Sequence, residues 1–216
     1  AYSSAGTYYV PLNLYTLAVG NEVYGCVPMV ESTGWIVLPY WQNGELVMNG
    51  TNAGAGQYIV WKYSPVSNTI NVTMHVTSSP EVDYSPGIVM YSPNWGSYSG
   101  DLIANGHYGV LVTFTGQAWY RVPSTSWNMV SNSIPKPNYN YPFTFTVIFT
   151  ENSAGNVTIS TVYINSTAYS VNINVPVPWS QIGYVGIRTD PNNFFYVSYF
   201  AVNGMALVSS NGVTTL

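Results

Sequence analysis

Residues 143–150, FTFTVIFT, and residues 70–77, INVTMHVT, decide the fold class of this chain. In the first stretch Phe or Val occupies every odd position, and Thr occupies most of the even ones. In the second stretch an apolar residue alternates with a polar one throughout. This period of two over six to eight residues is typical of a β-strand with one buried face and one solvated face. Both stretches are therefore predicted to be half-buried strands.

Turn residues separate this kind of run along the whole chain. Asn-Gly dipeptides favour tight hairpin turns, and clusters of Ser and Pro such as Ser79-Pro80 are interpreted as loops. The Asn-Gly dipeptides are Asn43-Gly44, Asn49-Gly50, Asn105-Gly106, Asn203-Gly204 and Asn211-Gly212. No stretch of ten residues has an apolar helical stripe. The sequence predicts an all-β protein, an antiparallel β-sandwich or jelly roll over residues 21–216.

The composition is unusual in its lack of charge. The 216 residues include 4 Lys and Arg, 8 Asp and Glu, and 20 Tyr, whereas about a quarter of an ordinary soluble domain is charged. Uncharged hydroxyl and amide groups must therefore keep this surface hydrated, and these groups do not titrate in acid. Covalent N-linked glycans would help, and four Asn-x-Ser/Thr sequons offer sites for them. The four acceptor residues are Asn49, Asn71, Asn156 and Asn165.

These features together predict a secreted, extracellular protein of the cell surface, suited to an acidic medium. The chain starts at Ala1 without a basic or apolar leader, which is typical of a mature form after signal removal. The single cysteine, Cys26, is interpreted as a buried small apolar residue. No apolar run reaches the roughly 18 residues that span a bilayer, so no membrane insertion of the mature chain is expected. The few Lys and Arg residues argue against a nucleic-acid partner.

The first twenty residues differ from the rest of the chain. Within TYYVPLNLYTLAVG (7–20) one face of a predicted strand is strongly apolar, and a Gly-Asn joint follows it. This segment is either the first strand of the sandwich or a donor strand that completes the sheet of a neighbouring subunit. Pro11 cannot donate a ladder hydrogen bond under either interpretation. The apolar face consists of Tyr8, Val10, Leu12 and Leu14.

Catalytic patterns are weak. The eight carboxylates are not paired on one predicted strand face, and Glu81 and Asp83 are assigned to a loop. His75 shares its strand face with threonines, so a solvated histidine is expected. Two histidines and one cysteine do not make a zinc site, and carboxylates are weak calcium ligands in acid. No enzyme activity, no metal and no cofactor other than attached glycans are expected.

Aromatic residues leave a sugar-binding role open. The 7 Trp residues are dispersed, and several fall in alternating runs where burial is the simpler interpretation. Trp95 and Trp127 fall in predicted loops and are the candidates for exposed glycan contacts.

The strand pattern of residues 27–209 resembles a concanavalin-like or laminin-G sandwich. The resemblance rests on strand runs and not on a functional motif. These runs are Ile70–Val76, Pro86–Tyr91, His107–Val110, Phe143–Phe149, Val157–Ile164, Gly183–Arg188 and Asn193–Val202.

The charge poverty, the sequons and the apolar N-terminal strand resemble the thread filament subunits of thermoacidophilic archaea, the Sulfolobales. That resemblance implies a sandwich head, a donated strand at residues 1–20, homopolymeric head-to-tail assembly and N-glycosylation. The function it implies is a structural subunit of a filament for adhesion or biofilm formation, with a surface or glycan as the adhesion target. The alternative is a secreted glycan-binding module or a glycoside hydrolase of concanavalin-like fold.

Overall fold

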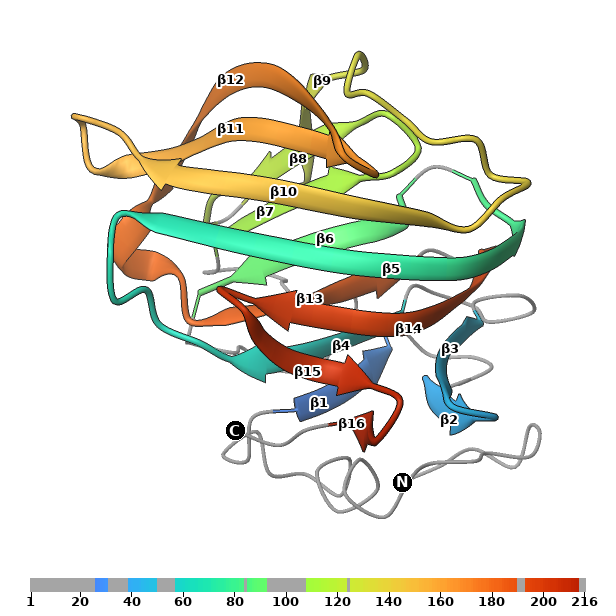
Figure 1. The fold of residues 1–216 in the computed structure, drawn as a ribbon. Helices are drawn as coiled ribbons and strands as arrows, with labels where there is room; N and C mark the ends of the chain where they lie inside the picture. The colour runs from blue at the N-terminus through green and yellow to red at the C-terminus, as the bar shows by residue number, and fades with distance from the viewer. Residues whose placement is uncertain are drawn as a thin grey trace.

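Two antiparallel β-sheets packed face to face form the described part of the protein, as the computed structural model shows (Figure 1). The structure describes residues 26–30, 39–49, 57–83, 85–92, 108–123, 125–189 and 193–213. This architecture confirms the predicted all-β sandwich. The predicted tail at residues 1–20, with Tyr8, Val10, Leu12 and Leu14, lies outside the described residues, so the proposed division at residue 20 stays a prediction.

The front sheet in Figure 1 has nine strands. Seven of them form a continuous ladder in the order β12-β11-β10-β5-β14-β15-β16, and β3 pairs with β14 and β2. The strands are β2 (Tyr40–Gln42), β3 (Glu45–Asn49), β5 (Thr69–Glu81), β10 (Phe143–Glu151), β11 (Asn156–Ile164), β12 (Thr167–Pro178), β14 (Phe194–Val202), β15 (Met205–Ser209) and β16 (Gly212–Val213).

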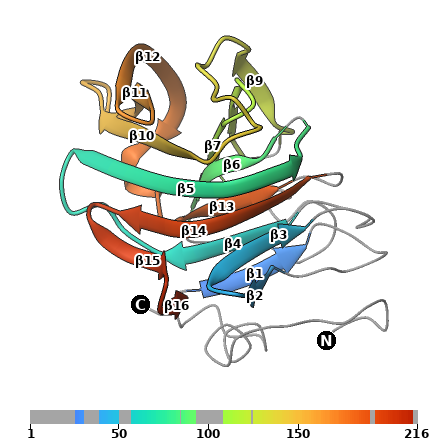
Figure 2. The ribbon, with the colours of Figure 1, turned by 45° about the vertical axis from the view of Figure 1, so that its right-hand side comes forward.

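The second sheet has seven strands in the order β1-β4-β13-β6-β7-β8-β9. Figure 2 shows it behind the first sheet. A short 3₁₀-helix (Trp179–Gln181) lies in the connection from β12 to β13. The strands are β1 (Cys26–Val30), β4 (Gln57–Lys62), β6 (Gly87–Tyr91), β7 (Gly109–Thr113), β8 (Ala118–Arg121), β9 (Asn128–Ser131) and β13 (Tyr184–Thr189).

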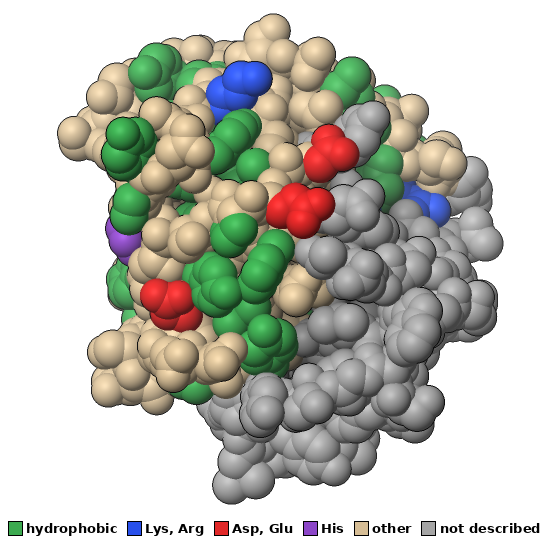
Figure 3. Space-filling view, turned by 90° about the vertical axis from the view of Figure 1, so that its right-hand side faces the viewer, with side chains coloured by type: hydrophobic (Ala, Val, Ile, Leu, Met, Phe, Trp, Pro, Cys, Tyr) green, Lys and Arg blue, Asp and Glu red, His purple; other side chains and the backbone are tan. Residues whose placement is uncertain are grey.

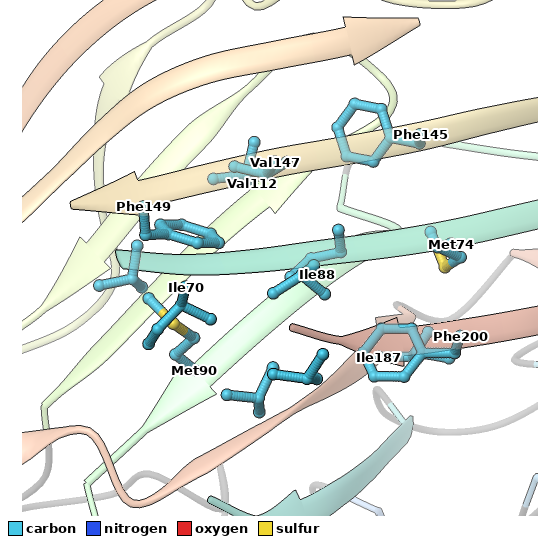
Figure 4. Packing of buried hydrophobic residues seen from close by; sticks show 14 of the residues in the cluster. Ile70, Met74, Ile88, Met90, Val112, Phe145, Val147, Phe149, Ile187 and Phe200 are labelled. Atoms are coloured by element: carbon cyan, nitrogen blue, oxygen red, sulfur yellow. The ribbon is translucent and has the colours of Figure 1, made fainter. Parts of the chain in front are cut away.

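Apolar side chains from both sheets fill the space between them (Figure 4). Phe114 is fully buried at the end of β7, and its ring lies 5.2 Å from Phe143, 6.2 Å from Phe145 and 5.3 Å from Phe195. All three contacts are edge-to-face, the geometry that aromatic quadrupoles favour. One aromatic ring therefore joins the seven-stranded sheet to two strands of the other sheet.

The alternating runs are strands, as predicted. Along β5 and β10 the apolar positions are buried and the Thr positions are partly exposed. Three Asn-Gly turns also occur as predicted, between β2 and β3, between β14 and β15, and between β15 and β16. Asn203 and Gly204 both have positive φ, of 47° and 79°, which Asn and Gly adopt most easily.

The loop predicted at Ser79-Pro80 is wrong, because β5 continues through both residues to Glu81. The register against β14 pairs Ser78 with Tyr196 and Glu81 with Phe194, so β5 has one extra residue there. Such a bulge accommodates a proline, which cannot donate a ladder hydrogen bond. Asp83 does lie in the connection that follows.

The surface is as poor in charge as the composition implies. Figure 3 shows a face on which a few acidic and basic side chains lie among uncharged polar and apolar ones. The outer face of the nine-stranded sheet instead carries hydroxyl groups that contact one another across neighbouring strands. Thr73 Oγ1 lies 3.0 Å from Thr146 Oγ1, and His75 Nδ1 lies 2.9 Å from Thr144 Oγ1. His75 thus shares its face with threonines, as predicted, and is half-buried.

Candidate functional site

The outer face of the seven-stranded sheet carries a second apolar cluster, separate from the core. Val60, Val89 and Leu111 alternate along β4, β6 and β7 with residues that point into the core, so they lie on the opposite face. The register pairs Val89 directly with Leu111. Tyr91 and Tyr184 complete this buried cluster. A sheet face directed away from the core is thus apolar and aromatic.

Two tryptophans pack against this cluster from one side. Trp119 on β8 is the cross-strand partner of Leu111, and its indole N–H donates to Gln117 Oε1 at 3.1 Å. Trp127 lies in the loop that leads into β9, as the sequence predicted, but it is half-buried. The loop prediction for Trp127 is confirmed, whereas the prediction of an exposed ring is wrong because neighbouring aromatic and cationic groups cover it.

Basic residues gather on this same face. Lys62 follows Val60 by two positions, Arg121 follows Trp119 by two, and Arg188 follows Tyr184 by four, so each shares the outer face of its strand. Only 4 Lys and Arg residues occur in the whole chain, and three of them are here. We name this surface the cationic–aromatic face; it consists of Lys62, Tyr91, Trp119, Arg121, Trp127, Tyr184 and Arg188.

The described carboxylates lie elsewhere. Glu45, Glu81 and Glu151 belong to β3, β5 and β10 of the nine-stranded sheet, and Asp83 lies in the connection after β5. Within the residues that the structure describes, positive charge is therefore concentrated on one sheet and negative charge on the strands and connections of the other.

Trp127 connects the parts of this face. Its ring centroid lies 6.2 Å from that of Tyr91, and the Arg188 guanidinium carbon lies 5.9 Å from the centroid. The second contact has cation–π geometry. A Cβ atom at Gly109 would approach Trp127 Cη2 to 2.8 Å, so the ring position depends on a glycine beneath it. The Trp127 Nε1 atom is buried and has no hydrogen-bond acceptor.

The face is closed at its centre and accessible at its rim. Arg121 and Arg188 are each 6% exposed. Met129, the cross-strand partner of Trp119, is 48% exposed, and the Lys62 side chain is also exposed. The exposed side chains are therefore Met129 on β9 and Lys62 at the end of β4.

The other predicted site residues are dispersed. Asn71 is exposed on β5, Asn165 is exposed in the turn between β11 and β12, and Asn49 and Asn156 are half-buried at strand ends. Asn165 Oδ1 accepts a hydrogen bond from the Thr144 backbone N–H, which leaves its amide nitrogen available for a glycan. N-glycosylation at these sequons stays a prediction. Trp95 lies outside the described residues, and so does the Cys26 side chain.

The described residues hold no group of three His, Cys, Asp or Glu side chains that could bind a metal ion. The run Gly183–Arg188 was predicted as a strand, but neither Arg188 nor Arg121 was predicted as a site residue. An arginine two residues after a tryptophan, or at the end of an apolar strand run, is the pattern that could have revealed them.

No protein-family model matches the chain. The chain is 56% identical over 196 residues to "Putative transmembrane protein ORF1334" of the Acidianus two-tailed virus, an archaeal virus. The alignment covers 89% of this chain and 15% of the viral protein, so the chain spans about one seventh of its relative's length. The predicted thread or pilus subunit of thermoacidophilic archaea is not confirmed by this match, which is to a protein of an archaeal virus.

The name of that relative corrects one prediction. A secreted, cell-surface location was expected, whereas the viral relative is named as a transmembrane protein. In the described part of the chain, no helix combines the length and the apolar character needed to cross a membrane.

Comparison with solved structures bears on the fold. The potassium-bound Emp46p carbohydrate recognition domain has a TM-score of 0.51 at 13% identity, and the match covers 90% of this chain and 95% of that one. Sheep galectin-11 has a TM-score of 0.41 at 10% identity, covering 66% and 95%. Alginate lyase Aly36B scores 0.44 at 11% identity, covering 82% and 87%. The first match shows the lectin-like sandwich fold of this chain.

Proposed function

We propose that this sandwich is a carbohydrate-binding domain of a longer protein, and that its cationic–aromatic face takes an anionic sugar. The observation that carries the proposal is the buried Trp127 Nε1 donor without an acceptor. A buried N–H without an acceptor is costly, by about 1–3 kcal/mol, and a ligand oxygen would remove that cost. The carbohydrate recognition domain of similar fold supports the ligand class.

The chemistry of the face favours an acidic sugar over a neutral one. Lys62 supplies an exposed ammonium group on this face, and the largely buried Arg121 and Arg188 supply guanidinium groups. Guanidinium groups bind carboxylate or sulfate oxygens with charge-assisted hydrogen bonds. The ring of Trp127 and that of Trp119 offer apolar surfaces to the C–H faces of a sugar. Because arginine stays protonated at every relevant pH, the affinity should follow the ionisation of the ligand and weaken with salt.

Isothermal titration calorimetry with hexagalacturonate at low salt tests this function. We expect binding in the wild-type protein and a loss of about tenfold or more in Arg188→Gln, since a charge-assisted hydrogen bond contributes about 1.5–3 kcal/mol. Trp127→Phe keeps an aromatic ring but removes the N–H donor, so a smaller loss is expected.

Lys136→Gln is the matched control, because it removes the one basic residue that lies off the face. Equal losses in Arg188→Gln and Lys136→Gln would show that net charge, and not this site, governs binding. Absence of hexagalacturonate binding, or tighter binding of single-stranded oligothymidine, would overturn the proposal.

The filament role stays a separate prediction, because its donor residues lie outside the described part of the chain. We expect deletion of residues 1–20 to leave a folded sandwich that no longer assembles into fibres. Electron microscopy and circular dichroism of the full chain and of the deletion variant check this. An unfolded deletion variant would instead indicate that the segment pairs within its own domain.

A further inference from the structure

A second concave surface lies on the other sheet, at the end of β5. A cleft of about 260 Å³ opens between that strand end and the loop that leads into β10. These two segments lie side by side at the right of Figure 1. The lining residues are Thr77, Ser78, Ser79, Pro80, Tyr139, Asn140 and Tyr141.

Hydrogen bonds fix both walls of the cleft. Ser79 Oγ donates to the Tyr139 carbonyl oxygen at 2.8 Å and so ties the strand to the loop. The Tyr139 hydroxyl donates to the Phe114 carbonyl oxygen at 3.1 Å, and burial raises the pKa of this phenol, so the donor keeps its proton in acid and at neutral pH. The Asn140 backbone N–H donates to Asn138 Oδ1 at 3.1 Å and closes the turn. The cleft is thus preformed, as ligand sites usually are.

The lining combines an aromatic ring with uncharged polar groups. The Tyr141 side chain is 67% exposed, although a large aromatic side chain is usually more buried than that. Ser78 is also exposed, and Asn140 adds an exposed amide. No Lys, Arg, Asp, Glu or His side chain lines the cleft. A flat ring beside hydroxyl and amide groups suits a neutral sugar, which presents an apolar C–H face and hydroxyl edges.

The surroundings extend the cleft and set its charge preference. Tyr196 on β14 is the cross-strand partner of Ser78, and its ring centroid lies 5.1 Å from that of Phe194. Glu81 is the partner of Phe194 and is exposed. A longer ligand therefore finds further aromatic surface along β14, while a carboxylate at that end disfavours an anionic ligand.

We infer that this cleft is a second carbohydrate site, specific for a neutral oligosaccharide, with Tyr141 as its stacking platform. Its volume is just below the range of about 300–1,000 Å³ typical of drug-sized ligands, which fits one sugar ring in the cleft and further rings toward Tyr196. The inference does not depend on the cationic–aromatic face, which lies on the opposite sheet and has the opposite charge preference.

Titration calorimetry of the full chain with three neutral hexasaccharides, maltohexaose, cellohexaose and mannohexaose, tests the inference. We expect at least one to bind the wild-type protein, and Tyr141→Ala to weaken it about tenfold, because aromatic platforms act as binding hot spots. Tyr169→Ala is the matched control, since this tyrosine is 42% exposed on β12 and lies two strands from β10.

Trp127→Phe separates the two sites, because it should leave binding of the neutral hexasaccharide unchanged. A circular dichroism spectrum and a melting temperature for each variant exclude misfolding as the cause of a loss. Failure of all three hexasaccharides to bind, or an equal loss in Tyr169→Ala, would overturn the second site. Loss of hexagalacturonate binding alone would bear only on the first.

Discussion

Phe114→Ala is expected to destabilise the protein by about 3–5 kcal/mol, the usual cost of removing a buried Phe side chain. The ring is fully buried and makes edge-to-face contacts with Phe143, Phe145 and Phe195. Its loss would leave a cavity between the two sheets, where the strands cannot easily collapse. Urea unfolding monitored by Trp fluorescence measures the change, and the melting temperature should fall by on the order of 10 °C.

The matched controls for this variant are conservative and exposed substitutions. Phe114→Leu keeps most of the buried volume and should cost clearly less than Phe114→Ala. Val66→Ala changes a side chain that is 91% exposed and should leave stability within about 0.5 kcal/mol of wild type. A Phe114→Ala protein as stable as Val66→Ala would contradict the described packing.

Gly186→Ala is expected to destabilise the protein about as much as Phe114→Ala, but through a clash with the backbone of a neighbouring strand and not through a cavity in the core. Gly186 lies in β13, between β4 and β6, and an added Cβ would overlap the Ile59 carbonyl oxygen and the Val60 backbone. Since the overlapped atoms are backbone, β13 would have to separate from β4. We expect a loss on the order of 4 kcal/mol, measured by urea unfolding, or a largely insoluble protein on expression.

Gly204→Ala is the control for this effect. Gly204 has a φ of 79° in the β14–β15 turn, and no atom lies within 4 Å of an added Cβ. Only the cost of a left-handed backbone applies there, about 1–2 kcal/mol. If Gly204→Ala proved more harmful than Gly186→Ala, the strand pairing assigned to β13 would be incorrect.

The strands that the sequence pattern predicted best are those with one buried face and one solvated face. In β5 and β10 the Thr positions remain partly exposed, so burial alternates along the strand and the sequence alternates with it. The strands β6, β7 and β13 are buried on both faces. The runs of β6 and β7 are apolar at most positions, so the sequence alternates little between the two faces of these strands.

Most residues of the candidate sites, Trp127 excepted, escaped prediction for the same reason. Leu111 and Tyr91 look like core residues in the sequence, and only the register against neighbouring strands shows that they lie on the outer face. Trp127 was selected because it falls in a loop, but its contacts with Tyr91 and Arg188 bring together residues far apart in the chain. The second cleft depends on a bulge at Ser79-Pro80, where turn-forming residues favoured a loop.

The placement of charge among the described residues bears on how the domain meets a charged surface. Lys62, Arg121 and Arg188 lie on the seven-stranded sheet, whereas Glu45, Glu81, Asp83 and Glu151 lie on the strands and connections of the other sheet. Charges separated in this way orient a molecule during approach, before any contact forms. Near a negatively charged surface the described charges would therefore favour the orientation in which the seven-stranded sheet faces that surface, and added salt would weaken this preference.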